Sequence, residues 1–106
     1  MSLQNGDVIA ERLIICERSH GERIRVTLRI GKPYRSSDVD WACPVQAEGL
    51  FDRLADIHGI DSFQALVLAQ GLLRSLLRGE AEDGTIFWWA DTHEPLDIEE
   101  MFGRDI

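Results

Sequence analysis

Lysine is almost absent from this sequence, which has a single lysine, Lys32, and a net charge of −8 at pH 7. Nucleic acids and anionic membranes are bound by cationic surfaces that attract their phosphate groups. The composition therefore predicts that the protein binds neither nucleic acid nor membrane. A basic protein partner would match the acidic charge, although the same charge would also serve to keep the protein in solution.

Cysteine and long apolar runs are also scarce. The two cysteines, Cys16 and Cys43, each lie in an apolar segment, which is typical of reduced core thiols. No apolar run approaches the roughly 18 residues of a membrane-spanning helix. Residues 1–7 have neither the basic flank nor the apolar core of a signal peptide. We therefore expect a cytoplasmic protein.

The residues that are present fit one globular domain, with 44% apolar and 28% charged side chains. A chain of this length buries about two-thirds of the surface that it exposes when unfolded. We assign residues 1–106 to a single α+β domain. We expect an antiparallel sheet of four or five strands, one long amphipathic helix packed across a face, and a short C-terminal helix.

Three segments have the features of strands. Residues 8–17 are rich in β-branched side chains, and residues 22–31 alternate between apolar and polar, so the two are expected to form a hairpin. Residues 39–47 also alternate, with Val39 facing inward. Because Pro44 cannot donate a backbone hydrogen bond, this third strand should lie at a sheet edge or be bulged there.

The next segments are less regular. Residues 35–38 are expected to form a loop. Residues 49–58 have apolar side chains at helical spacing, which favours a short helix, while a continued strand stays as the alternative.

Residues 62–78 are expected to form the long helix, with Asp61 or Ser62 as N-cap and Gly79 as the residue after its end. Gly71, in mid-helix, suggests a close packing contact. The apolar side chains cover about half of the circumference, which is wider than one sheet face requires. They are either covered on both flanks within the monomer or partly exposed at a subunit interface. They are Leu66, Leu68, Ala69, Leu72, Leu73, Leu76 and Leu77.

The last strand, residues 85–90, should return to the sheet. Alternation places Phe87 and Trp89 on one face and Trp88 on the other. A short helix starting at Glu94-Pro95 and ending near Gly103 could cover the exposed aromatic side chains, or a second copy of the chain could do so. We favour the homodimer, because the nine residues 95–103 offer too little apolar area to cover both the helix flank and the aromatic side chains. If exposed, the aromatic side chains would form a binding hot spot.

The binding candidates are therefore this aromatic strand and the acidic segment that follows it. Carboxylates near the C-terminus form a solvated acidic face that could contact a basic partner. The candidate residues are Phe87, Trp88, Trp89, Glu94, Asp97 and Glu100.

Three short motifs resemble a family of small bacterial domains of unknown function. They are the run Trp41-Ala42-Cys43-Pro44, the pair Gly49-Leu50, and the segment Gly59-Ile60-Asp61-Ser62-Phe63-Gln64-Ala65-Leu66 with Leu68-Ala69 after it. The resemblance covers roughly residues 7–90. It implies a bacterial source, no known activity and no functional residues, and it favours a strand within residues 49–58.

No pattern in the sequence indicates catalysis. The histidines His20, His58 and His93 lack the spacing of metal ligands. A Cys43–His58 dyad would need an accessible thiol, whereas Cys43 is expected to face inward. We expect no metal, no cofactor and no enzymatic activity. The favoured function is an interaction module, immunity-like or antitoxin-like. The alternative is a small-molecule-binding or enzymatic domain whose site is assembled from distant residues.

Overall fold

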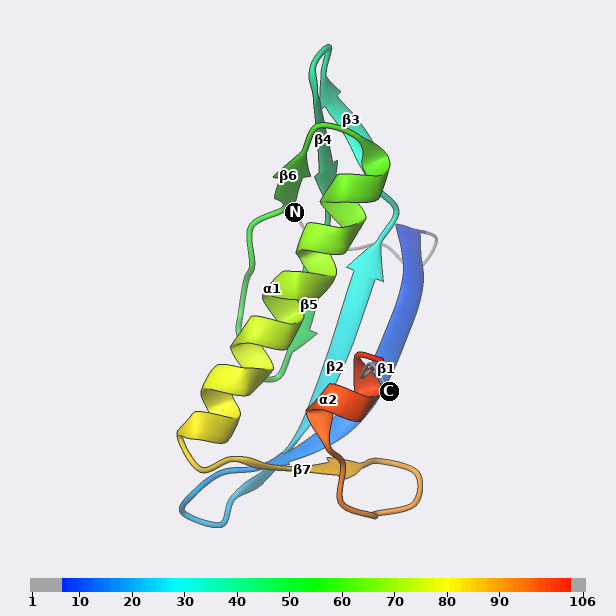
Figure 1. The fold of residues 1–106 in the computed structure, drawn as a ribbon. Helices are drawn as coiled ribbons and strands as arrows, with labels where there is room; N and C mark the ends of the chain where they lie inside the picture. The colour runs from blue at the N-terminus through cyan, green and yellow to red at the C-terminus, as the bar shows by residue number, and fades with distance from the viewer. Residues whose placement is uncertain (1–6, 104–106) are drawn as a thin grey trace.

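The computed structural model describes residues 7–103 and confirms the α+β class (Figure 1). Two antiparallel sheets share one long helix, α1, and a short helix, α2, lies near the C-terminus. The larger sheet has the strand order β5-β2-β1-β7, and the smaller has the order β3-β4-β6. The elements are β1 (Val8–Glu17), β2 (Arg23–Gly31), β3 (Tyr34–Ser37), β4 (Asp40–Cys43), β5 (Val45–Glu48), β6 (Ile57–Gly59), α1 (Ser62–Glu82), β7 (Ile86–Trp89) and α2 (Ile98–Met101).

The predicted β1–β2 hairpin is confirmed. Its strands pair antiparallel, with Ile14 opposite Val26 and Cys16 opposite Ile24. The alternation of β2 places its arginines on the face away from α1. Its apolar residues point toward the helix, and Val26 is fully buried. One face of the sheet is therefore core and the other is polar.

The predicted strand 39–47 is two strands in two different sheets. Pro44 separates them: β4 is the central strand of the small sheet, and β5 is an edge strand of the large one. A proline cannot continue a ladder as a donor, and here its carbonyl accepts a hydrogen bond from the Gly31 amide at 2.9 Å. The prediction that Val39 faces inward was wrong, because Val39 lies in the β3–β4 turn with 82% of its surface exposed.

Two further local predictions were wrong. The expected loop at 35–38 is largely β3, which pairs with β4. The expected helix at 49–58 is absent, and its last residues belong to β6, which also pairs with β4. Strand pairing within the small sheet overrides the helical spacing of a few apolar side chains.

Helix α1 begins as predicted and ends later. Asp61 is the N-cap, and its side chain accepts a hydrogen bond from the Gln64 amide at 2.8 Å. The helix continues through Gly79 to Glu82, so the prediction that Gly79 follows the helix end was wrong. The left-handed residue at this end is Gly84, with φ = +95°.

The buried side of α1 is narrower than the predicted apolar arc. Four residues at a spacing of four form its buried face: Ala65, Ala69, Leu73 and Leu77. The small residues come first because this end of α1 packs closely on the small sheet. A Cβ atom on Gly59 of β6 would lie 2.7 Å from the Ala65 nitrogen. The remaining apolar residues of the arc are partly or largely exposed, Leu68 to 45%.

The C-terminal segment folds back over the large sheet. Strand β7 pairs with β1, as predicted, with Phe87 opposite Cys16. Helix α2 is shorter than expected: Asp97 is its N-cap, and Pro95 forms an isolated bridge with Trp88 instead of starting the helix. Residues Leu96 and Ile98 are buried in the same core cluster as Phe87. The C-terminal segment is thus a cover for the sheet.

Candidate interaction surfaces

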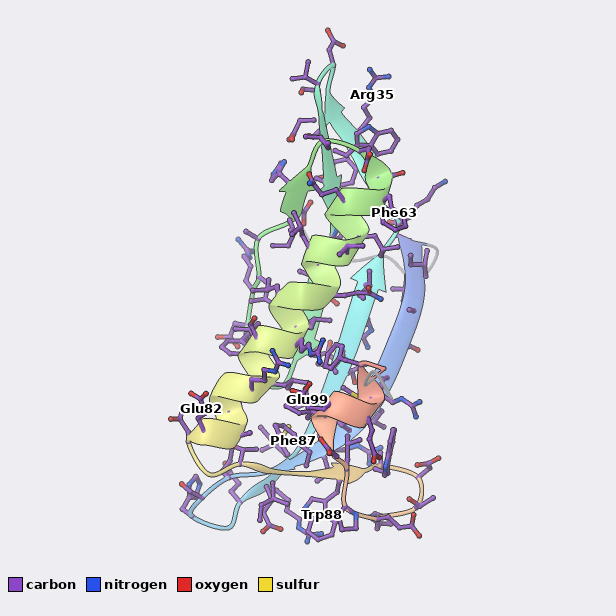
Figure 2. All side chains as sticks on the ribbon, viewed as in Figure 1. Arg35, Phe63, Glu82, Phe87, Trp88 and Glu99 are labelled. Carbon is purple, nitrogen blue, oxygen red and sulfur yellow. The ribbon has the colours of Figure 1, made fainter. Side chains whose placement is uncertain are left out.

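The aromatic strand β7 faces mostly inward. Phe87 is buried, at 5% exposure, and Trp89 is half-buried beneath Arg12, whose guanidinium carbon lies 4.6 Å from the ring centroid. Trp88 lies on the opposite face, where Arg23 stacks over it at 4.8 Å. Figure 2 shows Phe87 and Trp88 on opposite sides of the strand. The C-terminal segment packs with Phe87 in the core, whereas Trp89 is only partly covered, by Arg12 of β1.

The acidic candidates divide into structural and exposed carboxylates. Asp97 caps α2, and its side chain accepts a hydrogen bond from the Glu99 amide at 2.9 Å. Glu99 itself binds two arginines of α1, with 2.5 Å to Arg74 and 2.6 Å to Arg78. Glu94 and Glu100 are exposed. They leave negative charge at the surface beside β7 and α2.

Among the described residues, one edge of β1 is only half occupied. Strand β7 pairs with β1 along Ile14–Glu17, so residues 8–13 have no neighbouring strand on that side. We call residues 8–13 the free β1 edge. A hollow of about 200 Å³ lies beside it on the helix side. The hollow is lined by Ala10, Leu28, Ile30, Leu73, Met101 and Phe102, among others.

The outer side of α1 carries a second apolar surface. Ile60 and Phe63 are 74% and 75% exposed, and Val67 is 46% exposed. The twelve residues from Ser62 to Leu73 contain no charged side chain. Gly71 continues the line begun by Phe63 and Val67, because residues four apart lie on one helix face. A Cβ atom at Gly71 would meet nothing within 4 Å.

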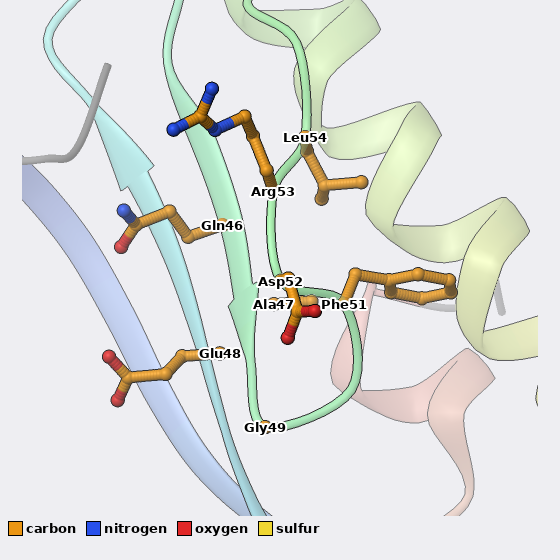
Figure 3. Close-up of a pocket in the computed structure, with 8 residues that line it drawn as sticks. All are labelled: Gln46, Ala47, Glu48, Gly49, Phe51, Asp52, Arg53 and Leu54. Carbon is orange, nitrogen blue, oxygen red and sulfur yellow. The ribbon is translucent and has the colours of Figure 1, made fainter.

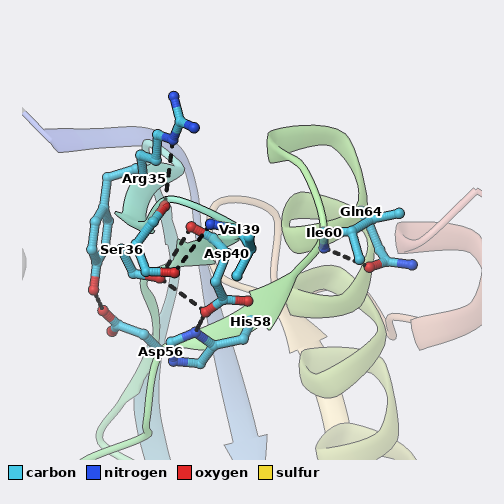
Figure 4. Close-up of polar contacts among 10 residues, drawn as sticks. Arg35, Ser36, Val39, Asp40, Asp56, His58, Ile60 and Gln64 are labelled. Carbon is cyan, nitrogen blue, oxygen red and sulfur yellow. Dashed lines mark hydrogen bonds and ion pairs between the residues drawn. The ribbon is translucent and has the colours of Figure 1, made fainter.

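A polar cluster occupies the outer face of the small sheet (Figure 4). His58 Nδ1 lies 2.5 Å from an Asp40 carboxylate oxygen, which also accepts a hydrogen bond from Ser36 at 2.9 Å. These hydrogen bonds lower the pKa of Asp40, that of His58 being the larger cause. Tyr34 donates to Asp56, and this hydrogen bond raises the pKa of Tyr34.

Sequence reasoning missed this cluster because it depends on two strands that were not predicted. Tyr34 and His58 are both directly opposite Ala42 in the ladder, so the three share one face. Ala42 is fully buried although it points away from α1. Periodicity alone cannot assign the partners of Asp40 and Ala42 on β3 and β6, because these depend on the strand pairing.

The chemical sites considered from sequence are not formed. Cys43 is buried, with its sulfur 3.4 Å from the Gly31 carbonyl oxygen. His58 is on the other face of the small sheet, so the two make no dyad. Burial raises the pKa of Cys16 to about 12, with the Glu80 carboxylate adding to the effect. Within residues 7–103, no three His, Cys, Asp or Glu side chains are grouped to hold a metal ion.

A further hollow, of about 250 Å³, lies between β5 and the loop that follows it (Figure 3). Gly49 makes this turn possible: its φ is +100°, and a Cβ atom there would lie 2.3 Å from the Arg25 carbonyl oxygen. Phe51 and Leu54 point toward α1, whereas Gln46 and Glu48 point away from it. The polar side chains around this hollow do not converge on a common point.

These features define a small α+β domain with apolar and acidic surfaces and no assembled metal centre among the described residues. A family model described as "Domain of unknown function (DUF6968)" matches residues 10–98, and the chain belongs to this family. The prediction of an uncharacterised domain family is thereby confirmed. No curated protein and no solved structure matches the chain. Within residues 7–103, no helix combines the length and apolar character needed to cross a bilayer.

Proposed function

We propose that the protein is a non-enzymatic interaction module that binds an extended segment of a basic protein along the free β1 edge. In the manner of an immunity protein or antitoxin, it would act by masking that partner. The observation that carries the proposal is the coincidence of three features at one place. They are an unpaired strand edge, an apolar hollow and exposed carboxylates.

The unpaired edge supplies the backbone part of recognition. Peptide groups at a strand edge form hydrogen bonds with an added strand, which provides affinity without regard to side chains. Successive side chains of the added strand point to opposite faces. Every second residue of the segment would therefore face the hollow lined by Leu73, Met101 and Phe102.

The negative charge beside the free β1 edge supports a basic sequence for the bound segment. Asp91 lines a second hollow along the same edge, together with Glu11, Arg12 and Leu13. Glu100 precedes Met101 in α2, and its side chain is exposed. Arg12 is held over Trp89, and Glu11 is paired with Arg29 at 3.1 Å. The remaining carboxylates would attract lysine or arginine and increase the association rate.

Selection from a random peptide library tests this proposal directly. We expect the selected peptides to alternate apolar and basic residues. On binding, amide chemical shifts should change at residues 8–13 and around Met101. Peptides without basic residues, or shift changes confined to another surface, would refute the proposal.

Charge-reversal variants sharpen the test. Asp91→Lys combined with Glu100→Lys should weaken binding of the selected peptides at least tenfold. Glu82→Lys combined with Asp83→Lys makes the same change in net charge at the distant end of α1, where Figure 2 shows Glu82. The control pair should retain most of the affinity. Equal losses in both pairs would mean that overall charge alone determines binding.

The Asp40–His58 contact favours a second candidate, a small-molecule-binding or catalytic site on the small sheet. With Asp40 ionised, His58 donates from Nδ1, and a neutral ring then has Nε2 as an acceptor. The cluster draws its side chains from two segments that are separated in sequence, residues 34–40 and 56–58. Titration of a metabolite set against labelled protein tests this site. A ligand that shifts His58 and is lost in His58→Phe supports it, and no shift for any compound contradicts it.

A further inference from the structure

Phe63, Val67 and Gly71 form an exposed line along α1. The spacing of these three residues suits the association of two copies about a two-fold axis. Phe63 and Gly71 flank Val67 at equal distances, four residues to either side. When two copies of a helix pack antiparallel about an axis at Val67, Phe63 of each copy lies against Gly71 of the other. The exposed fractions match these roles, because Phe63 projects at 75% exposure and Gly71 leaves open space above it.

The direction of this line excludes a role in the monomer core. Each helical residue advances by about 100°, which places Phe63, Val67 and Gly71 roughly opposite the buried stripe that runs from Ala65 to Leu77. A mid-helix glycine costs about 1 kcal/mol relative to alanine. Within the described part of the chain, no neighbouring atom requires a glycine at position 71. A contact with another molecule would account for it.

Charge favours a second copy over a basic partner as the occupant. A chain with net charge −8 repels its own copies wherever carboxylates would meet. The segment from Ser62 to Leu73 has no charge, so two copies can approach there without that penalty. A basic partner would gain no electrostatic attraction at the same surface. Closed two-fold pairing, in which both copies use one patch, is also the commonest assembly of soluble proteins.

We propose that the protein forms a two-fold symmetric dimer in which the outer faces of α1 pack antiparallel around Val67, with Phe63 of each copy seated on Gly71 of the other. Ile60 falls opposite Arg74 of the second copy in this arrangement. The proposed contact through Phe63, Val67 and Gly71 shares no residue with the free β1 edge, so the two proposals are tested separately. Failure of either proposal leaves the other in place.

Sedimentation velocity over a range of micromolar concentrations tests the dimer. We expect a species with twice the 12.0 kDa mass of one chain, populated increasingly at higher concentration. Because a single helix pair buries less area than a standard interface, the association should be reversible and concentration-dependent. A species of 12.0 kDa at every concentration would overturn the proposal.

Two neighbouring residues provide a matched pair of variants. Val67 and Leu68 are 46% and 45% exposed, but they face different sides of α1. Val67→Glu should weaken association at least tenfold, because it places two carboxylates at the axis. Leu68→Glu should change the association constant less than twofold. Circular dichroism confirms that both variants keep the helix. Equal dissociation by the two would overturn the proposed face.

An exchange of the large and small residues tests the pairing itself. A Cβ atom at position 71 meets nothing within 4 Å, and the ring of Gly71→Phe would occupy the space proposed for the other copy, so this change should abolish dimerisation. Adding Phe63→Ala to Gly71→Phe reverses the positions of the large and small residues and should restore association to a measurable level. A Gly71→Phe variant that still dimerises like the parent would contradict the proposed contact.

Discussion

Arg78 of α1 and Glu99 of α2 are joined by two hydrogen bonds, with Nε 2.6 Å from one carboxylate oxygen and an Nη atom 2.8 Å from the other. Arg74 binds the same carboxylate from one turn earlier. The geometry is the paired, planar contact that favours arginine over lysine. It fastens the C-terminal segment to the long helix, and with it the cover over Phe87.

This contact predicts a specific loss of stability in acid. The hydrogen bonds from Arg78 and Arg74 lower the pKa of Glu99 from 4.5 to about 2. Its contribution is therefore fully present above pH 4.5 and is lost as the pH falls toward 2. We expect the free energy of unfolding to decline more steeply over this range in the parent than in Glu99→Gln. Denaturant titrations at a series of pH values measure both slopes, and parallel slopes would contradict the expectation.

The start of α1 offers a test with a neighbouring control. Asp61 accepts from the Gln64 amide, whereas Ser62 is the first residue of the helix. Asp61→Ala should lower the free energy of unfolding by about 1 kcal/mol, because a helix amide loses its partner. Ser62→Ala should have a much smaller effect. Equal losses in chemical denaturation would mean that the cap is shared between the two side chains.

The sequence predicted those parts of the fold that depend on interactions between residues close together in the chain. The alternation in β2 and the cap at Asp61 identified the hairpin and the helix start. The small sheet was missed because its strands are three or four residues long, too short for periodicity to be distinctive. Pro44 was recognised as unable to continue a ladder, but nothing local indicated that the chain changes sheets there.

Some features of the candidate surfaces were also predictable from the sequence, and others depended on the tertiary structure. The aromatic and acidic side chains of β7 and the C-terminal segment were identified from composition, while their burial depended on how that segment folds. The free β1 edge is invisible in sequence, since it results from the short length of β7 beside a long β1. The wide apolar arc of α1 did indicate a surface beyond the core, but the exposed line runs through Phe63 and Val67, outside the residues assigned to that arc.

Substitutions at two glycines, Gly79 and Gly84, test where helix α1 ends. Gly79 lies within the helix, and a Cβ atom there would meet nothing within 4 Å, so Gly79→Ala should stabilise the protein by about 0.5–1 kcal/mol. Gly84 has φ = +95°, and a Cβ atom there would lie 3.2 Å from the Ser19 Cβ atom. Gly84→Ala should therefore destabilise the protein by more than about 1 kcal/mol. Thermal unfolding of the two variants should shift in opposite directions.

The cysteines should be inert in the folded protein. Burial raises the pKa of both thiols, that of Cys16 to about 12, and both side chains are fully buried. A disulfide-exchange reagent at neutral pH should react with neither until denaturant is added, after which both should react. The single variants Cys16→Ser and Cys43→Ser assign any reaction to one thiol. Rapid modification of the native parent would show that one of the thiols becomes accessible without unfolding.

Two leucines of α1, one buried and one exposed, allow a test of how much burial contributes to stability. Leu73 is 3% exposed and lies between α1 and the large sheet, whereas Leu68 is 45% exposed. Leu73→Ala should lower the free energy of unfolding by about 2–5 kcal/mol, because it removes buried methyl groups and leaves a cavity.

Leu68→Ala should cost less than about 1 kcal/mol, since surface substitutions of this kind leave the core intact. Because both changes remove the same atoms from the same helix, their difference isolates burial from helix propensity. Denaturation midpoints measured at the lowest protein concentration that gives a signal minimise the effect of the proposed self-association on the comparison. Similar midpoints for the two variants would mean that Leu73 does not pack against the sheet as described.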